Sequence, residues 1–102
     1  MAGKGARANP DVRPSVRIDK WLWQARFCKT RALATDLVQG RKVRLNGQHV
    51  TKPGHSVAAG DILTFPQGAR IRVVRVMALG QRRGPADEAQ MLYDDLDPAP
   101  LD

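Results

Sequence analysis

Residues 18–38 read IDKWLWQARFCKTRALATDLV, and this stretch decides the fold that we expect. Apolar residues in its first half recur at i, i+3, i+4 and i+7, the spacing of one helix face: Ile18, Trp21, Leu22 and Ala25. Asp19 stands where a carboxylate can cap free N–H groups and meet the positive end of the helix dipole. The pattern predicts a short helix over residues 19–26.

The second half of the stretch predicts another helix. Thr30 is a good N-cap residue, and an apolar stripe follows it at Leu33, Ala34, Leu37 and Val38. Gly40 comes after the last turn and suits a left-handed backbone at the helix end. Only a short break separates the two helices, so we expect them to pack as a tight pair.

The apolar pattern changes to a period of two after the second helix, which is typical of strands. We expect strands at residues 42–45, 48–50, 61–65 and 69–77, with a turn at 66–68. Asn46-Gly47 is a strong hairpin signal because both residues accept a positive φ. Residues 85–93 could form one amphipathic helix, and the Asp-rich residues 94–102 are expected to be loose.

These patterns predict an α+β fold, in which two short helices pack on a small, twisted, mostly antiparallel sheet and a short C-terminal helix follows. A length of 102 residues suits one domain with a modest core. We expect a disordered basic arm at residues 1–14, the folded domain at 15–77, and an extension with a short helix and an acidic tail at 78–102.

The charge is unevenly distributed. Lys and Arg number 17 against 10 Asp and Glu, for a net charge of +7. All of the basic residues lie in residues 1–83, whereas residues 84–102 contain six acids and no Lys or Arg. Nine basic residues and two acids fall within residues 17–52 alone. Charge runs are usually solvated surface, but this density favours a polyanionic partner.

Several classes of protein are excluded or disfavoured. No apolar run is long enough for a transmembrane helix, and residues 1–17 lack the apolar segment of a secretory signal. The lone Cys28 is expected to be a small buried residue, and His49 and His55 have no cysteine partner for a metal site. We therefore expect a cytoplasmic, monomeric, non-enzymatic protein with no catalytic residue, no cofactor and no metal, and with no membrane as partner.

An ordered set of motifs resembles the alpha-L RNA-binding domain, first described in the fourth protein of the small ribosomal subunit. The motifs are RIDKWL at 17–22, KTR at 29–31, Gly40, VRLNG at 43–47, KP at 52–53 and GD at 60–61. Two longer strings, DKWLWQARFCKTRALA at 19–34 and QRRGPADEAQMLY at 81–93, resemble the bacterial fifteen-kilodalton heat-shock protein family. Members of that family often have a longer, strongly basic C-terminal extension, whereas this sequence ends in acidic residues.

The resemblance implies the alpha-L RNA-binding fold and a stress-response protein that binds RNA of the large ribosomal subunit, with tRNA as a further candidate ligand, in the recycling or quality control of stalled ribosomes. Its RNA face would lie on the helix pair and the first hairpin. Carried over by position, the RNA-binding residues would be Arg17, Lys20, Arg26, Lys29, Thr30, Arg31, Arg41, Lys42, Arg44 and Asn46. For Thr30, capping of its own helix is the favoured use.

Several alternatives stay open. The chain could be an RNA-targeting module for a separate RNA-modifying enzyme, a basic adaptor for an acidic protein, or, more weakly, a DNA-binding protein. Trp23 could stack on a base, or it could pack against the last strand or the 85–93 helix. Asp94, Asp95 and Asp97 could fold over the cationic face, although a solvated tail is favoured.

Overall fold

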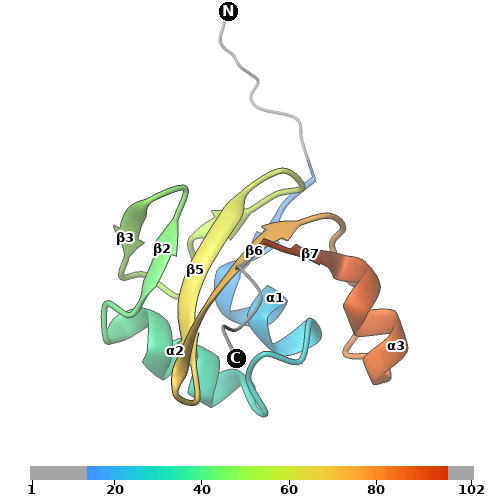
Figure 1. Cartoon of the computed structure of the whole chain (residues 1–102), viewed down its shortest axis with the longest axis horizontal. Helices are drawn as coiled ribbons and strands as arrows, with labels where there is room; N and C mark the ends of the chain where they lie inside the picture. The colour runs from blue at the N-terminus through green and yellow to red at the C-terminus, as the bar shows by residue number, and fades with distance from the viewer. Residues whose placement is uncertain (1–13, 97–102) are drawn as a thin grey trace, which may run out of the picture.

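The computed structural model describes residues 14–96, which form three α-helices and antiparallel sheets (Figure 1). The helices are α1 (Ile18–Gln24), α2 (Arg31–Gln39) and α3 (Ala86–Ala89), and a 3-10 turn η1 (Gln90–Leu92) follows α3. The strands are β1 (Val16–Arg17), β2 (Val43–Leu45), β3 (Gln48–Val50), β4 (Ser56–Val57), β5 (Ile62–Gln67), β6 (Arg70–Val76) and β7 (Tyr93–Asp95). This confirms the α+β class. The expected basic arm, apart from Pro14, lies outside the described residues.

The main sheet has five strands in the order β3-β2-β5-β6-β7, and every pairing is antiparallel. The β2–β3 hairpin turns at Asn46 and Gly47, whose φ angles are 52° and 88°, as the Asn-Gly signal predicted. The β5–β6 hairpin is longer than expected. Pro66 and Gln67 were predicted to lie in a turn, but they continue β5 and pair with Ile71 and Arg70.

A second, two-stranded sheet holds the beginning of α1. In it β1 pairs with β4, so that Val16 faces Val57. Backbone hydrogen bonds continue this contact into the helix, where the N–H of Ile18 donates to the carbonyl of His55 at 2.8 Å. Strands of two residues carry too little periodicity to be recognised in a sequence, so this element was not predicted.

The core lies between the helix pair and the main sheet. Trp21 and Leu22 of α1 are completely buried, and Ala34 and Val38 of α2 share their cluster. The sheet contributes buried residues mainly at alternate positions: Val43, Leu63, Phe65, Val74 and Val76. Trp21 also donates its indole N–H to the carbonyl of Ala78 at 3.0 Å, so the buried indole has a partner. The predicted helix stripes therefore face the core, with the exception of Leu33 on α2, which is 51% exposed.

The ends of α1 differ from the prediction. The helix spans Ile18–Gln24 rather than residues 19–26, because Arg26 takes a left-handed backbone with a φ of 66°. Asp19 lies in the first turn but does not cap it; its carboxylate is turned to other side chains, as described below.

The N-terminal end of α2 agrees with the prediction, whereas the C-terminal end differs from it. Thr30 caps the helix, since its hydroxyl oxygen accepts from the N–H of Leu33 at 3.1 Å. Gly40 is not left-handed, with a φ of −78°; the left-handed residue is Arg41, with a φ of 63°. A Cβ on Gly40 would lie 3.1 Å from the carbonyl oxygen of Asp36, so glycine there allows a close backbone approach.

The C-terminal part also differs from the prediction. The helical residues end at Leu92, and Tyr93 begins β7, which pairs with β6. The ring of Tyr93 lies 4.5 Å from that of Phe27. Asp94 and Asp95 are therefore strand residues rather than parts of a loose tail. Asp95 forms an ion pair of 2.8 Å with Arg72. Residues 97–102, including Asp97, lie outside the part of the chain that the structure describes.

Candidate nucleic-acid interface

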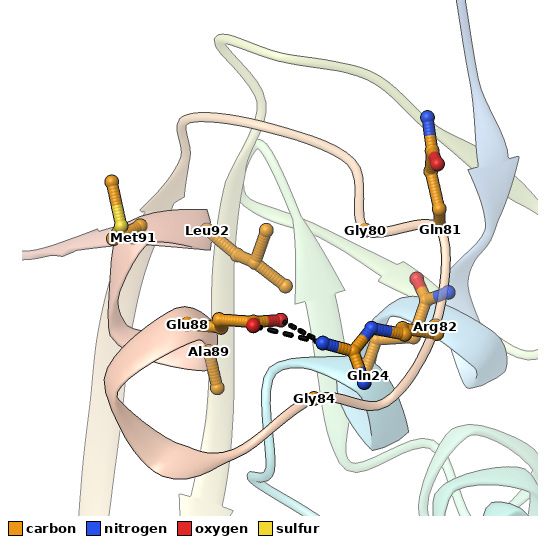
Figure 2. Close-up of a pocket in the computed structure, with 9 residues that line it drawn as sticks. All are labelled: Gln24, Gly80, Gln81, Arg82, Gly84, Glu88, Ala89, Met91 and Leu92. Atoms are coloured by element: carbon orange, nitrogen blue, oxygen red, sulfur yellow. Dashed lines mark hydrogen bonds and ion pairs between the residues drawn. The ribbon is translucent and has the colours of Figure 1, made fainter.

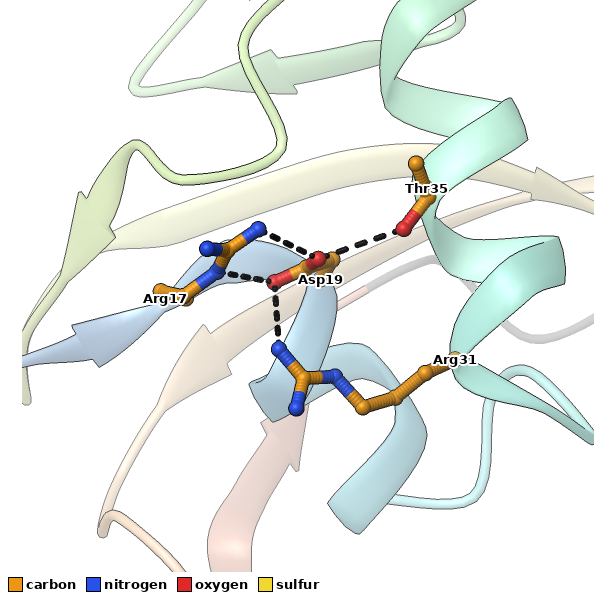
Figure 3. A network of polar contacts seen from close by, with 4 residues as sticks. All are labelled: Arg17, Asp19, Arg31 and Thr35. Atoms are coloured by element: carbon orange, nitrogen blue, oxygen red, sulfur yellow. Dashed lines mark hydrogen bonds and ion pairs between the residues drawn. The ribbon is translucent and has the colours of Figure 1, made fainter.

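Asp19 is the centre of a polar cluster that joins β1, α1 and α2 (Figure 3). Its carboxylate is almost fully buried and accepts two hydrogen bonds of 3.0 Å from the guanidinium of Arg17. The hydroxyl of Thr35 donates to it at 3.2 Å, and a guanidinium nitrogen of Arg31 lies 3.5 Å away. Two of the expected RNA-binding arginines are thus held by one buried acid.

Two opposing effects act on the pKa of Asp19. Burial penalises the charged carboxylate and would raise the pKa, but the hydrogen bonds and charges of Arg17, helped by Thr35 and Arg31, outweigh burial. The pKa of Asp19 is therefore held below its ordinary value, and the pKa of Arg17 is raised by the same contact. The cluster stays ionised at neutral pH.

Arg17 and Arg31 remain accessible to solvent despite their contacts with Asp19, since their side chains are 55% and 44% exposed. A guanidinium has five N–H donors, and Asp19 uses only some of them. The buried acid therefore fixes the position of two arginines and leaves donors that a phosphate group can accept.

Five other expected contact residues form no ion pair within residues 14–96: Lys20, Lys29, Arg41, Lys42 and Arg44. Lys29 lies immediately before the capped N-terminus of α2, where the helix dipole also favours an anion. Lys42 and Arg44 are exposed on either side of the buried Val43, as the predicted alternation requires. These side chains contribute positive charge that nothing in the described fold neutralises.

Besides Arg17, Arg31 and the capping Thr30, two expected contact residues have their polar atoms engaged within the fold. The amide of Asn46 accepts from the N–H of Ile62 at 2.9 Å and donates to Asp61 at 3.3 Å, which fixes the β2–β3 turn against β5. The guanidinium of Arg26 donates to the carbonyl of Gly84 at 2.9 Å. Asn46 is exposed, and so is the rest of Arg26, so both remain candidates for contact.

The loop at residues 80–84 adds arginines that the sequence did not single out. Arg83 donates from Nε to the carbonyl of Trp23 at 3.1 Å, and its guanidinium lies 5.9 Å from the centre of the Trp23 ring. The guanidinium of Arg83 thus lies over the Trp23 ring. The adjacent pair Arg82-Arg83 was the available signal, but its position beside α1 depends on the tertiary fold.

Phe27 belongs to the core rather than to the interface. Its ring lies 4.9 Å from that of Phe65 and 4.5 Å from that of Tyr93, and the guanidinium of Arg72 lies 5.3 Å from its centre. Cys28 beside it is buried, and burial raises the pKa of its thiol. Residues 14–96 contain no group of three His, Cys, Asp or Glu that could hold a metal ion.

This chain is similar in sequence and fold to known proteins. The model of the S4 domain family matches residues 16–63. The heat shock protein 15 of Escherichia coli K12 is 50% identical over 80 residues, and the match covers 78% of this chain and 59% of that protein. The homologue from Aeromonas salmonicida is 48% identical over 88 residues, which cover 85% of this chain and 66% of that protein.

The solved structure of the Vibrio cholerae heat shock protein 15 overlaps most of both chains. It has 45% identity and a TM-score of 0.76, and the match covers 80% of this chain and 82% of that one. This chain belongs to the heat shock protein 15 family. It spans about three-fifths to two-thirds of the length of the curated relatives named above. The family structure also corrects the expectation of a monomer, because the Vibrio cholerae protein is trimeric.

All ten residues that the sequence assigned to RNA binding fall within the S4 match at residues 16–63. Within residues 14–96, no helix is long and apolar enough to cross a membrane.

Proposed function

We propose that this chain is a non-enzymatic RNA-binding protein of the cytoplasm that binds ribosomal RNA of the large subunit, with tRNA as a second candidate ligand, during the recycling or quality control of stalled ribosomes. The observation that carries the proposal is the match to the S4 RNA-binding family over the segment that contains every candidate contact residue. The cations that no acid in the described fold neutralises support it.

The chemistry of the proposed contact is phosphate recognition. Lys and Arg side chains displace the counterions of folded RNA, which makes binding strongly dependent on salt. Arg17 and Arg31 are held by Asp19 and can present their remaining donors to phosphate oxygens, while Lys29 and Lys42 act as point charges. Such a surface recognises the shape of an RNA backbone rather than a base sequence.

The test removes Lys29 and Lys42 together, because neither side chain has an ion pair in residues 14–96 whose loss would affect folding. Lys29→Ala plus Lys42→Ala is expected to weaken binding to a large-subunit rRNA fragment. The log–log salt slope should fall by about 1.5, at roughly 0.7–0.9 for each phosphate that the chain no longer neutralises. Affinity and slope are measured by fluorescence anisotropy over a salt series.

The control of equal charge is Arg70→Ala plus Arg75→Ala, which removes two positive charges from β6, outside the proposed contact set. Because Arg75 pairs with Asp94 at 4.0 Å, thermal unfolding first verifies that this variant stays folded. If both double variants weaken binding equally, the effect comes from net charge and the proposed interface is wrong. Nuclease treatment distinguishes the adaptor alternative, since binding to an acidic protein would survive the removal of RNA. Co-purification of a catalytic chain would instead favour the RNA-targeting module.

The assembly of the Vibrio cholerae relative extends the proposal to oligomeric state. We propose that this chain also forms a trimer, so that three copies of the cationic surface belong to one particle. Several weak phosphate contacts then act together on one RNA, which raises the overall affinity without any new type of contact.

A further inference from the structure

A cavity of about 280 Å³ lies between the end of α1, the loop at residues 80–84, and the α3–η1 segment (Figure 2). Ala89 and Leu92 form part of its apolar wall, and Met91 stands at its side with 76% of its surface exposed. Four polar residues also line it: Gln24, Gln81, Arg82 and Glu88. This combination of an apolar wall with a few polar groups is typical of a small-ligand site.

Gln24 is the unusual member of this set. Its side chain is completely buried, yet neither its amide oxygen nor its amide nitrogen has a hydrogen-bond partner. The backbone of the loop lies close to it, since a Cβ on Gly80 would come within 3.3 Å of the amide carbon of Gln24. Burying an amide without partners is costly, so this side chain points to a partner that the cavity would admit.

An ion pair lies across the cavity. Arg82 contacts both carboxylate oxygens of Glu88 at 3.0 and 2.8 Å, and Figure 2 shows the pair spanning the space between the loop and α3. Both side chains are more than half exposed, at 68% and 52%. Exposed ion pairs contribute little to stability, so Arg82 can leave Glu88 at low cost, and a ligand would need a movement of this kind to reach the buried amide of Gln24.

We propose that this cavity binds one unstacked adenine base of the RNA, read by the amide of Gln24. The inference deepens the proposed function and rests on it. A primary amide presents one donor and one acceptor side by side, which matches the N6 and N7 edge of adenine. The apolar wall would pack against the base, and the freed guanidinium of Arg82 would contact the adjoining phosphate.

The cavity is also continuous with the proposed interface. Arg26, one of the candidate contact residues, donates to the carbonyl of Gly84, and Gly84 lines the cavity. Arg83 fixes the same loop to Trp23. An RNA strand that contacts Arg26 would therefore lie near the loop at residues 80–84, from which one extruded base could enter the cavity.

The experiment compares two RNA hairpins that differ only in one bulged nucleotide, adenine or 7-deazaadenine, which lacks the N7 acceptor. The wild-type chain is expected to bind the adenine hairpin about tenfold more tightly, in the range of one bidentate base contact. Gln24→Met removes the amide, keeps a similar volume, and is expected to bind both hairpins equally while remaining folded. Gln90→Met makes the same change at an exposed glutamine of η1 that does not line this cavity, and it should keep the preference.

The possible outcomes separate this inference from the function on which it rests. If the wild-type chain binds both hairpins equally, or if Gln24→Met keeps the preference, the adenine site is wrong and general RNA binding stands. If neither hairpin binds, the adenine site is wrong, and if the large-subunit rRNA fragment also fails to bind, the proposed function is wrong as well. A third measurement follows the side-chain amide signal of Gln24 by NMR when the adenine hairpin is added. An unchanged signal would mean that only a buried water contacts the amide. Loss of the trimer in Gln24→Met, measured by sedimentation, would mean that a second copy of the chain fills the cavity. Either result overturns the proposal.

Discussion

Asp19 links the stability of the fold to the placement of the RNA-binding arginines. Its buried carboxylate holds Arg17 from β1, and Arg31 and Thr35 from α2. Replacing Asp19 alone leaves the guanidinium groups of Arg17 and Arg31 without the acid that orients them. A single side chain therefore affects both the packing of the helix pair and the shape of the proposed interface.

Asp19→Asn is expected to lower the free energy of unfolding at pH 7 by about 1–3 kcal/mol, because it removes hydrogen bonds between charged groups. The pKa of Asp19 is lowered in the native state, so its contribution is complete above the unfolded-chain pKa of about 3.9. That contribution is lost as the pH falls through the native pKa. Urea unfolding at pH 7, 4 and 3 measures the difference, which should shrink toward the lowest pH.

Asp36→Asn is the matched control, because Asp36 is exposed on α2 and has no side-chain hydrogen bond or ion pair within residues 14–96. It should leave the free energy of unfolding nearly unchanged at every pH. A pH-independent loss in Asp19→Asn would show that the mutation acts through packing rather than through the ionised carboxylate.

Residue roles were predictable from the sequence where the partner is local. The cap at Thr30 and the turn at Asn46-Gly47 depend on neighbours within a few positions, and both were predicted. The role of Asp19 was not predicted: Arg17 is only two positions away, but Arg31 and Thr35 reach Asp19 only through the packing of α2 on α1. A local rule assigned Asp19 to a cap, whereas the tertiary fold brings Arg31 and Thr35 to it.

At the scale of elements, β7 is the least expected part of the fold. It follows a helical segment directly and closes the sheet at the edge opposite β3 (Figure 1). The helix pair and the first hairpin could be predicted because their apolar periods are clear, whereas β1 and β4 are too short to show one. In β7 the pairing with β6 and the packing of Tyr93 on Phe27 prevail over the helical pattern.

Tyr93→Ala is expected to free β7 from the sheet, because its ring packs 4.5 Å from that of Phe27. The loss should be about 2–3 kcal/mol, less than for a fully buried aromatic ring, since Tyr93 is only half-buried. Amide hydrogen exchange should accelerate at β7 and in its partner strand β6, and should change little in α2 and β2. Uniformly faster exchange would mean that β7 is part of the global unfolding unit instead.

Tyr93→Phe provides the control for this element. It keeps the ring and removes a hydroxyl that has no hydrogen bond within the described residues. Its exchange pattern and stability should match those of the wild type. A large effect would show that the hydroxyl, rather than the ring, holds β7 in place.

For the whole molecule, the net charge of +7 has opposite effects on its two proposed associations. Like-charged copies repel one another, so a trimer forms against an electrostatic cost that salt reduces. Binding to RNA gains from the same charge and weakens as salt rises. Sedimentation of the RNA-free chain should therefore show more trimer, of three times the 11.2 kDa chain mass, at high salt than at low salt. The affinity for RNA should fall over the same range of salt concentration. A trimer that dissociates as salt rises would contradict this, because its interface would then depend on ion pairs between copies that outweigh the general repulsion.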